Sequence, residues 1–318
     1  MTHQIRTFGE ATIAAAAAII ADGGIVAVPT ETVYGLAADA TDAAAVSRIY
    51  AAKGRPSFNP LIVHVADLAA AERIAVFDED AQLLAAAFWP GPLTLVLPVR
   101  IDAGIAGLVT AGLKTVAIRV PRHRAMQALI AAAGVPLAAP SANASGGISP
   151  TRAEHVAASL GDRVPLIIDD GPCPAGVEST IVSGRTVLRP GPVTADDIVR
   201  VTGASPDRAT AFVERQQGRE NPRTITAPGQ LLSHYAPSKP LRLDAHERHD
   251  DEYLIGFGAI NGDFNLSPAG DPVEAAVNLF DALHRADASS AGKIATAPIP
   301  LAGIGAAIAD RLHRAAMP

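Results

Sequence analysis

Two cations, Lys53 and Arg55, stand two residues apart and offer the clearest chemistry in the sequence, the binding of an anion. A glycine and two prolines surround them and exclude a regular helix, so the pair lies on a rigid loop. The apolar run 61–65, interrupted only by His64, follows the loop and predicts a short buried strand. A fixed loop loses little entropy on binding, which favours anion recognition. The alternatives are a solvated basic turn and a His64 that is an ordinary core residue.

Hydroxyl side chains follow a second predicted strand, 25–28. Thr30 and Thr32 come directly after it, beside Tyr34 and Gly35, where a buried strand pair would otherwise be apolar. Their place favours a small-ligand pocket. Threonines are also ordinary strand residues, so this segment alone leaves both interpretations open.

A small polar loop, 140–147, follows the predicted strand 136–139 and carries Ser141 and Asn143. Such a loop brings backbone N–H groups and hydroxyls against phosphate oxygens. Many loops share this composition, so the pattern favours a phosphate site without specifying one.

Residues 115–120 alternate between branched aliphatic side chains and other residues, which predicts a strand. Because side chains alternate across a strand, Arg119 is expected on the face opposite the aliphatic residues, beside Thr115 and Ala117.

The elements that position these residues follow from periodicity and capping. Residues 42–52 predict a helix with Asp42 as its N-cap, and this helix delivers Lys53 and Arg55 at its end. Further helices are predicted over 11–21, 78–88 and 152–159, and further strands over 93–97, 166–168, 178–182 and 187–191.

The length of 318 residues suggests two domains. Residues 207–238 are polar and proline-rich with little periodicity, which predicts a linker between a domain over 1–206 and another over 239–318. Within the last range the predicted order is strand, strand, helix, strand, helix, which indicates a small α/β domain. Its two G-x-G sequences do not complete a dinucleotide fingerprint.

Composition excludes several classes of protein. The net charge is −6 and both parts of the chain carry more acids than bases, which argues against a broad nucleic-acid surface. The single cysteine, Cys173, excludes an intramolecular disulfide and a cysteine-rich metal site. The N-terminal sequence lacks a signal-peptide pattern and the apolar run 14–21 is too short to span a bilayer, so a cytoplasmic protein without membrane contact is expected.

Several motifs, in this order, resemble the Sua5 branch of the YrdC/Sua5 family, the L-threonylcarbamoyladenylate synthases. They are PTETVYGL (29–36), KGRPSFNPLIVH (53–64), WPGPLT (89–94), AIRVP (117–121), PSAN (140–143), EST (178–180) and RPG (189–191). The linker sequence HYAP (234–237) and the C-terminal domain distinguish this branch from the single-domain branch. The resemblance covers nearly the whole chain.

The resemblance implies a fold and a reaction. The fold is an open, twisted α/β sheet with a concave cationic face, followed by a small Rossmann-like α/β domain. The reaction joins L-threonine, bicarbonate and ATP into threonylcarbamoyl-AMP with release of pyrophosphate, and Mg²⁺ accompanies the nucleotide. The product passes to the tRNA threonylcarbamoyl transferase complex, which modifies adenosine 37.

The resemblance also implies roles for individual residues. The catalytic set is Lys53, Arg55, Ser141 and Asn143; the ATP contacts are Arg55, Asn59, Thr115, Ser141, Ser149, Arg189 and Tyr235; the threonine contacts are Thr32, His64, Arg119, Ser179 and Thr180. Arg119 suits a bidentate pair with the substrate carboxylate. The linker is expected to fold over the catalytic face with Tyr235 reaching the site. No protein nucleophile and no metal-ligating side chain is implied.

Two other functions compete with this one. An RNA-binding protein would use the same concave face, and the acidic balance of the chain argues against general RNA affinity. A carbamoyl-handling module like the related domain of hydrogenase-maturation proteins would be accompanied by acylphosphatase and zinc-finger domains, which this sequence lacks.

Overall fold

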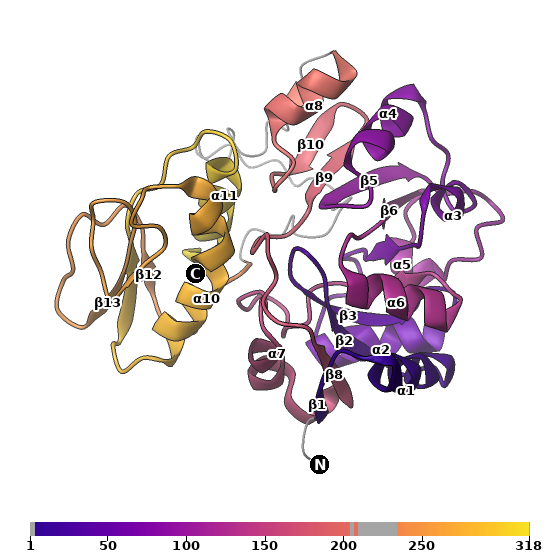
Figure 1. Ribbon diagram of the computed structural model, residues 1–318, viewed down its shortest axis with the longest axis horizontal. Coiled ribbons are helices and arrows are strands. Elements are labelled where there is room, and N and C mark those ends of the chain that lie inside the picture. The colour runs from indigo at the N-terminus through magenta and orange to yellow at the C-terminus, as the bar shows by residue number, and fades with distance from the viewer. Residues whose placement is uncertain (1–3, 204–206, 209–233, 318) are drawn as a thin grey trace.

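The computed structural model describes residues 4–203, 207–208 and 234–317. Figure 1 shows two α/β parts side by side, a larger N-terminal part and a smaller C-terminal part whose helices face it. Most of the predicted linker lies outside the described residues, so the predicted domain boundaries stay a prediction.

One mixed sheet of eleven strands forms the frame of the N-terminal part, in the order β1-β8-β2-β3-β7-β4-β6-β5-β9-β10-β11. The strands are β1 Gln4–Thr7, β2 Val26–Pro29, β3 Tyr34–Asp39, β4 Ile62–His64, β5 Leu93–Pro98, β6 Thr115–Arg119, β7 Leu137–Ala138, β8 Leu166–Asp169, β9 Thr180–Ser183, β10 Thr186–Arg189 and β11 Asp207–Arg208. The order brings segments far apart in sequence, such as β4 and β6, side by side at the centre.

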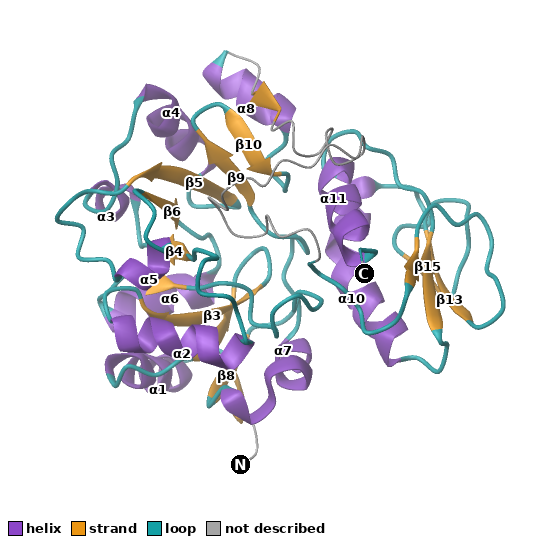
Figure 2. Cartoon of the chain, turned by 180° about the vertical axis from the view of Figure 1, so that it is seen from behind, coloured by secondary structure: helices purple, strands orange, loops and turns teal. Residues whose placement is uncertain are grey.

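Helices cover both faces of this sheet (Figure 2). They are α1 Glu10–Ala21, α2 Ala43–Lys53, α3 Leu68–Glu72, α4 Glu79–Phe88, α5 Gly107–Thr110, α6 Arg124–Ala133, α7 Ala153–Leu160, the 3₁₀ helix η1 Gly161–Arg163 and α8 Ala195–Thr202. Alternate residues of β2 enter two different cores: Ala27 packs into the core of α2 and α4, while Val26 and Val28 pack against α1 and α6. The sheet is therefore buried on both faces at its centre.

Helix α2 sets the position of the cationic loop. The Asp42 side chain accepts a hydrogen bond from the Ala44 N–H and so caps the helix start, as the sequence predicts. Gly54 ends the helix in the left-handed region, with φ of 61°. The chain therefore turns directly after Lys53, and Arg55 starts a loop against the sheet.

Strand β6 confirms the predicted alternation. Val116 and Ile118 belong to the large core, whereas Ala117 belongs to a separate cluster on the opposite face. Arg119 ends the strand and lies in register with His64 of the parallel neighbour β4. Because register partners face the same side of a sheet, these two side chains are neighbours.

The C-terminal part contains a four-stranded parallel sheet ordered β12-β15-β13-β14, with two helices against it. Its elements are β12 Leu241–Arg242, β13 Glu252–Gly256, β14 Phe264–Asn265, α10 Pro272–Ala288, β15 Lys293–Thr296 and α11 Gly305–Ala315. This agrees with the small α/β domain that the sequence predicts. None of the helices in the described ranges is long and apolar enough to cross a membrane.

Some elements were not predicted from the sequence. Strand β3 is buried along almost its whole length, so it shows no alternation of apolar and polar residues. Helix α6 follows directly on a basic run at 122–124, which is more typical of a loop. Both elements matter to the site, because β3 and α6 flank the strand ends that carry it.

Candidate functional site

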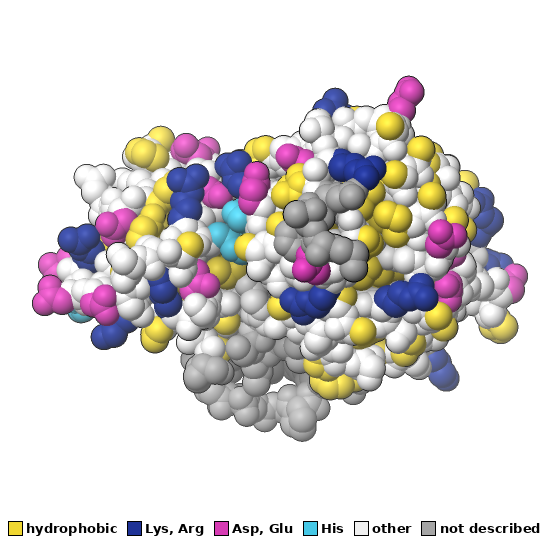
Figure 3. Space-filling model, turned by 90° about the horizontal axis from the view of Figure 1, so that it is seen from below, with side chains coloured by type: hydrophobic (Ala, Val, Ile, Leu, Met, Phe, Trp, Pro, Cys, Tyr) yellow, Lys and Arg dark blue, Asp and Glu magenta, His cyan; other side chains and the backbone are white. Residues whose placement is uncertain are grey.

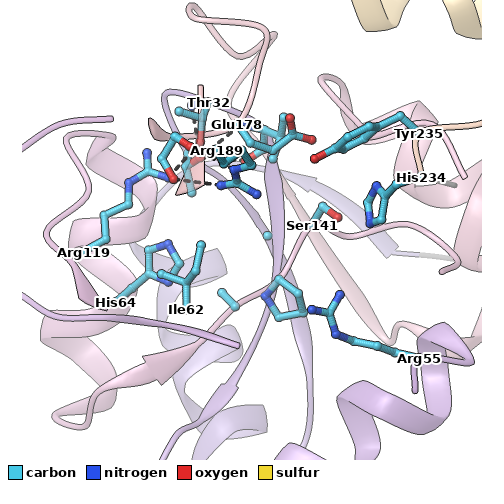
Figure 4. Close-up of a pocket in the computed structure, with 16 residues that line it drawn as sticks. Thr32, Arg55, Ile62, His64, Arg119, Ser141, Glu178, Arg189, His234 and Tyr235 are labelled. Atoms are coloured by element: carbon cyan, nitrogen blue, oxygen red, sulfur yellow. Dashed lines mark hydrogen bonds between the residues drawn. The ribbon is translucent and has the colours of Figure 1, made fainter. Parts of the chain in front are cut away.

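A pocket at the centre of the large sheet is lined by 16 residues (Figure 4). They are Thr30, Thr32, Val33, Gly35, Arg55, Ile62, His64, Arg119, Ala139, Pro140, Ser141, Glu178, Ser179, Arg189, His234 and Tyr235. Figure 4 shows Arg119 and His64 on one side of the pocket and Arg55, His234 and Tyr235 on the other. The structure thus brings together eight residues that the sequence assigns to the site: Thr32, Arg55, His64, Arg119, Ser141, Ser179, Arg189 and Tyr235.

Arg119 is held by three partners at one end of the pocket. Its Nη2 donates to Glu31 Oε1 at 2.6 Å, its Nη1 to Thr32 Oγ1 at 3.0 Å and its Nε to the Gly91 carbonyl at 3.1 Å. These described partners use three of the five guanidinium N–H donors. A guanidinium fixed in this way has a set orientation toward a ligand carboxylate.

Glu31 balances the charge of Arg119. Burial, the largest single influence, opposes its ionised form, but the charge and hydrogen bond of Arg119, together with backbone hydrogen bonds, hold the pKa of Glu31 below its ordinary value. Its second oxygen, Oε2, accepts hydrogen bonds from the backbone N–H groups of Arg122 and His123. The carboxylate is therefore ionised and fully engaged.

His64 is neutral in this environment. Burial, and then the charge of Arg119, lower the pKa of its imidazole to about 3. Its Nδ1 atom has no hydrogen-bond partner among the described residues. A neutral ring beside Arg119 is able to accept or donate one hydrogen bond to a ligand.

Arg55 and Lys53 are buried at the other end and are held by backbone carbonyls. Arg55 donates from Nε to the Asn59 carbonyl at 3.2 Å and from Nη2 to the Pro60 carbonyl at 2.9 Å. Lys53 Nζ donates to the carbonyls of Ser141 and Asn143. Lys53 thereby ties the helix end to the 140–147 loop instead of lining the pocket.

The pKa values of both cations are lowered, chiefly by burial. The pKa of Arg55 falls to about 10, so its guanidinium stays charged at neutral pH. The pKa of Lys53 lies well below its ordinary value, because burial is joined by repulsion from Arg55 and Arg163. An anion placed between these groups would favour the charged form of both.

Arg189 and Ser179 line the pocket between its two ends. Arg189 donates from Nε to the Ser179 carbonyl at 3.0 Å and from Nη2 to Ser179 Oγ at 3.1 Å. Ser179 Oγ also shares a hydrogen bond with Thr94 Oγ1 at 2.7 Å. Glu178, the preceding residue, lines the pocket as well.

The segment 234–237 contributes His234 and Tyr235 to the lining of the pocket. The Ala236 N–H donates to the Gly146 carbonyl at 2.8 Å, which joins this segment to the 140–147 loop. Tyr235 adopts a φ of 66°, which is rare for a residue with a side chain, and its ring is only 1% exposed. Its hydroxyl has no hydrogen-bond partner in the described part of the chain.

Six predicted site residues do not line the pocket: Lys53, Asn59, Thr115, Asn143, Ser149 and Thr180. Thr180 bonds the Val193 carbonyl and Ser149 donates to Glu178, so both hydroxyls have partners within the fold. Thr115 lies four residues before Arg119 on β6, roughly 13 Å along the strand.

Glu31, Glu178 and His234 are site residues to which the sequence gave no role. Glu31 and Glu178 stand inside the motifs PTETVYGL and EST, immediately before assigned residues, and His234 precedes Tyr235. A carboxylate is unexpected in an anion site, and only its pairing with a particular arginine explains its presence.

Buried polar atoms without partners gather around this pocket. Within the described residues, seven buried side-chain atoms have no hydrogen-bond partner, and six of them belong to Asn59, His64, Asn143, His234 and Tyr235. Buried polar groups in folded proteins are nearly always hydrogen-bonded. The cluster therefore marks a place where a polar ligand would satisfy several groups at once.

His64 gives a prediction for stability against pH. Its pKa is lowered from 6.5 to about 3, so the unfolded chain takes up a proton that the folded chain refuses as pH falls below 6.5. Between pH 7 and pH 5 this costs the wild-type protein about 2 kcal/mol of unfolding free energy. His64→Gln should remove that share of the loss, measured by urea unfolding at both pH values.

The exposed His246 supplies the control, because His246→Gln also removes a histidine but leaves the pocket intact. An equal loss of stability in wild-type and His64→Gln proteins would show that His64 is not held neutral.

Comparison with known proteins agrees with this geometry. A family model of Sua5, YciO and YrdC proteins, described as "Telomere recombination", matches residues 18–191. A second model, described as "Threonylcarbamoyl-AMP synthase, C-terminal domain", matches residues 193–317. The two models account for both parts of the chain.

Curated relatives and a solved structure match over nearly the full length. A threonylcarbamoyl-AMP synthase of Bacillus subtilis is 41% identical over 96% of this chain and 92% of its own, and one of Pyrococcus abyssi is 39% identical over 94% and 92%. The crystal structure of P. abyssi Sua5 complexed with L-threonine covers 99% of this chain and 97% of its own, with 37% identity and a TM-score of 0.88. The chain therefore belongs to the YrdC/Sua5 family, in its two-domain Sua5 branch.

Proposed function

We propose that this protein is a nucleotidyltransferase that makes L-threonylcarbamoyl-AMP from L-threonine, bicarbonate and ATP, with release of pyrophosphate. Family membership and the names of the relatives support the reaction. The observation that carries the proposal is one pocket with a buried arginine at each end, Arg119 and Arg55, and a third, Arg189, between them. Two anionic substrates fit such a pocket.

The Arg119 end is proposed to hold L-threonine. Arg119 takes the carboxylate through its remaining N–H groups, and Thr32 and Ser179 add hydroxyl contacts, with Thr180 behind them. His64 faces the amino group and the carbamate that forms on it. The neutral state of His64 suits this place, because a neutral ring accepts a hydrogen bond from an amine.

The other end is proposed to hold ATP. Arg55 and Arg189 contact the phosphates, and Ser141 and Asn143 contact them from the 140–147 loop. Lys53 holds that loop in place through its hydrogen bonds to the Ser141 and Asn143 carbonyls. Asn59, Thr115 and Ser149 are assigned to ATP by family resemblance alone. Tyr235 contributes its hydroxyl, which has no hydrogen-bond partner among the described residues.

Mg²⁺ is proposed to arrive with the nucleotide. No group of three or more His, Cys, Asp or Glu side chains in the described residues is placed to hold a metal ion. Glu178, which lines the pocket, and Glu31, which holds Arg119, are each paired with an arginine. The ligands of Mg²⁺ would therefore be phosphate oxygens and water, as is common for this ion.

The chemistry needs positioning and charge compensation more than a reactive side chain. The threonine amine attacks the carbon of bicarbonate, and loss of water leaves a carbamate. A carbamate oxygen then forms a bond to the α-phosphorus of ATP, while the bond from that phosphorus to the bridging oxygen of pyrophosphate breaks. Fixed cations reduce the repulsion between the two anions and hold them in line. No protein nucleophile takes part.

The product is a reactive mixed anhydride, which water destroys. The buried His234 and Tyr235 form one side of the pocket, where they are proposed to limit the access of water. The product is proposed to pass in the cytoplasm to the tRNA threonylcarbamoyl transferase complex. Nothing favours the RNA-binding alternative: the pocket cations are buried, and Figure 3 shows basic side chains interspersed with acidic ones over the face it presents.

Omission of single substrates tests the proposed reaction. Pyrophosphate release should require L-threonine, bicarbonate and ATP together, because the attacking carbamate forms only from the first two. Coupled phosphate detection after pyrophosphatase treatment measures it. Equal release with L-alanine in place of L-threonine would contradict the threonine assignment.

Arg55→Ala should weaken the use of ATP. A charge-assisted hydrogen bond contributes about 1.5–3 kcal/mol, so KM for ATP should rise roughly tenfold to a hundredfold. Arg48→Ala removes an exposed arginine from helix α2, which precedes the loop of Arg55, and serves as the control. An unchanged KM in folded Arg55→Ala protein would remove Arg55 from the site.

Tyr235→Phe tests the unpaired hydroxyl. Removing a buried hydroxyl without a partner should leave Tm unchanged or raise it in the absence of ligand, because its desolvation is uncompensated. The rise in Tm on addition of ATP should become smaller, because a hydrogen bond to the nucleotide is lost. An ATP-induced rise equal to that of the wild type would show that the hydroxyl does not contact ATP.

A further inference from the structure

Arg311 of helix α11 is the largest side chain among those that the described structure buries completely. It belongs to the C-terminal part and crosses to the N-terminal part. Its Nε donates to Glu178 Oε2 at 2.9 Å and its Nη1 to the Pro190 carbonyl at 2.7 Å. Glu178 lines the pocket, so the C-terminal part reaches the pocket wall through a full charge.

The Glu178 carboxylate needs this partner because of where it stands. It is the residue next to Ser179, which holds Arg189, and its charge acts on Arg189. Without Arg311 the nearby cation able to neutralise it would be Arg189, which is proposed to contact ATP. An unpaired carboxylate would also repel both anionic substrates across a poorly hydrated pocket.

The contacts around Arg311 hold the Glu178 carboxylate so that it does not pair with Arg189. Glu178 Oε1 accepts a hydrogen bond from Ser149 Oγ while Oε2 accepts from Arg311. Asp310 bonds Arg311 Nη1 at 3.0 Å and Arg314 Nε at 2.9 Å. Two carboxylates and two guanidiniums thus alternate in one buried network, whose charges balance only if Arg311 is present.

The balance of charge in this network matters because the network is buried between the two parts. One apolar core joins Val33 and Val177 of the N-terminal part with Leu279 and Phe280 of α10, so the two parts are packed as one body here. The Arg311 guanidinium also lies 5.4 Å from the ring centre of Tyr235, which lines the pocket. Few water molecules reach such a place, and electrostatic interactions are correspondingly strong.

We propose that Arg311 is a positioning residue for the reaction in the N-terminal part. It neutralises Glu178 and holds the carboxylate against Ser149 and α11, which leaves Arg189 and Arg55 available to the phosphates. The inference rests on the proposed function, since it concerns how the same pocket accepts ATP. It gives the C-terminal part a chemical role in the site, beyond that of a tether.

Adhesion between the two parts is the competing role for Arg311, and the chain offers a matched control. Arg152 Nε, next to α7, pairs with Asp281 Oδ1 of α10 at 3.0 Å. This ion pair also joins the two parts, but neither residue lines the pocket. Arg152→Met removes an interdomain arginine without touching Glu178.

The experiment compares Arg311→Met, Glu178→Gln/Arg311→Met and Arg152→Met in the full-length protein. Pyrophosphate release gives KM for ATP and kcat, and calorimetry gives ATP affinity independently of turnover. Arg311→Met should raise KM and the ATP dissociation constant on the order of tenfold, because one carboxylate is uncompensated. The double variant should return to within about threefold of wild type, since no charge is left in the pair.

Arg152→Met should stay within about threefold of wild type, because a half-exposed ion pair contributes little. Equal effects of Arg311→Met and Arg152→Met on KM would overturn the proposal, and so would a double variant as impaired as Arg311→Met. If Arg311→Met does not fold, the ATP affinity of the double variant decides alone: near wild-type affinity supports the proposal and a tenfold loss overturns it. Absence of pyrophosphate release from the wild-type protein would instead contradict the proposed function, while calorimetry would still decide the role of Arg311.

Discussion

Burial of four cationic side chains around one pocket is the constraint on which the rest of this structure depends. Desolvation is the largest cause of the lowered pKa values of Lys53, Arg55 and Arg189. Backbone carbonyls bind these three, whereas Arg119 has the full carboxylate of Glu31. Carbonyl groups carry only partial negative charge, so a positive field remains in the pocket. An anion would complete the compensation, which supports the proposal that the pocket binds one.

The two ends of the pocket differ in how far that compensation goes. At one end Arg119 and Glu31 form a pair that is neutral overall, so it offers a ligand oriented hydrogen-bond donors more than net charge. At the other end two backbone carbonyls accept the hydrogen bonds of Arg55, and they carry no full negative charge to balance its own. A singly charged amino-acid carboxylate suits the first end and a triphosphate suits the second. Under the proposed function, the reacting atoms of the two substrates would meet between the ends.

Packing between the two parts of the chain is continuous with the pocket wall. The same apolar core contains Val33 and Tyr235, which line the pocket, and Phe280 of α10. The C-terminal helices and the pocket wall are therefore connected through one packed core. Because interiors are close-packed, such a connection transmits strain and charge over short distances. The small parallel sheet of the C-terminal part supports the two helices that make these contacts.

The sequence by itself determined the local structures that hold the site residues. The Asp42 cap and Gly54 fix where α2 ends, and the alternation of β6 fixes which face Arg119 occupies. Ordered motifs along the chain were sufficient for the family and hence for the fold. Only the tertiary structure decided which charges meet: Glu31 with Arg119 and Glu178 with Arg311, pairs separated by 88 and 133 residues. Strand order and the docking of two parts create those pairs, and no local pattern of residue types encodes a partner so far along the chain.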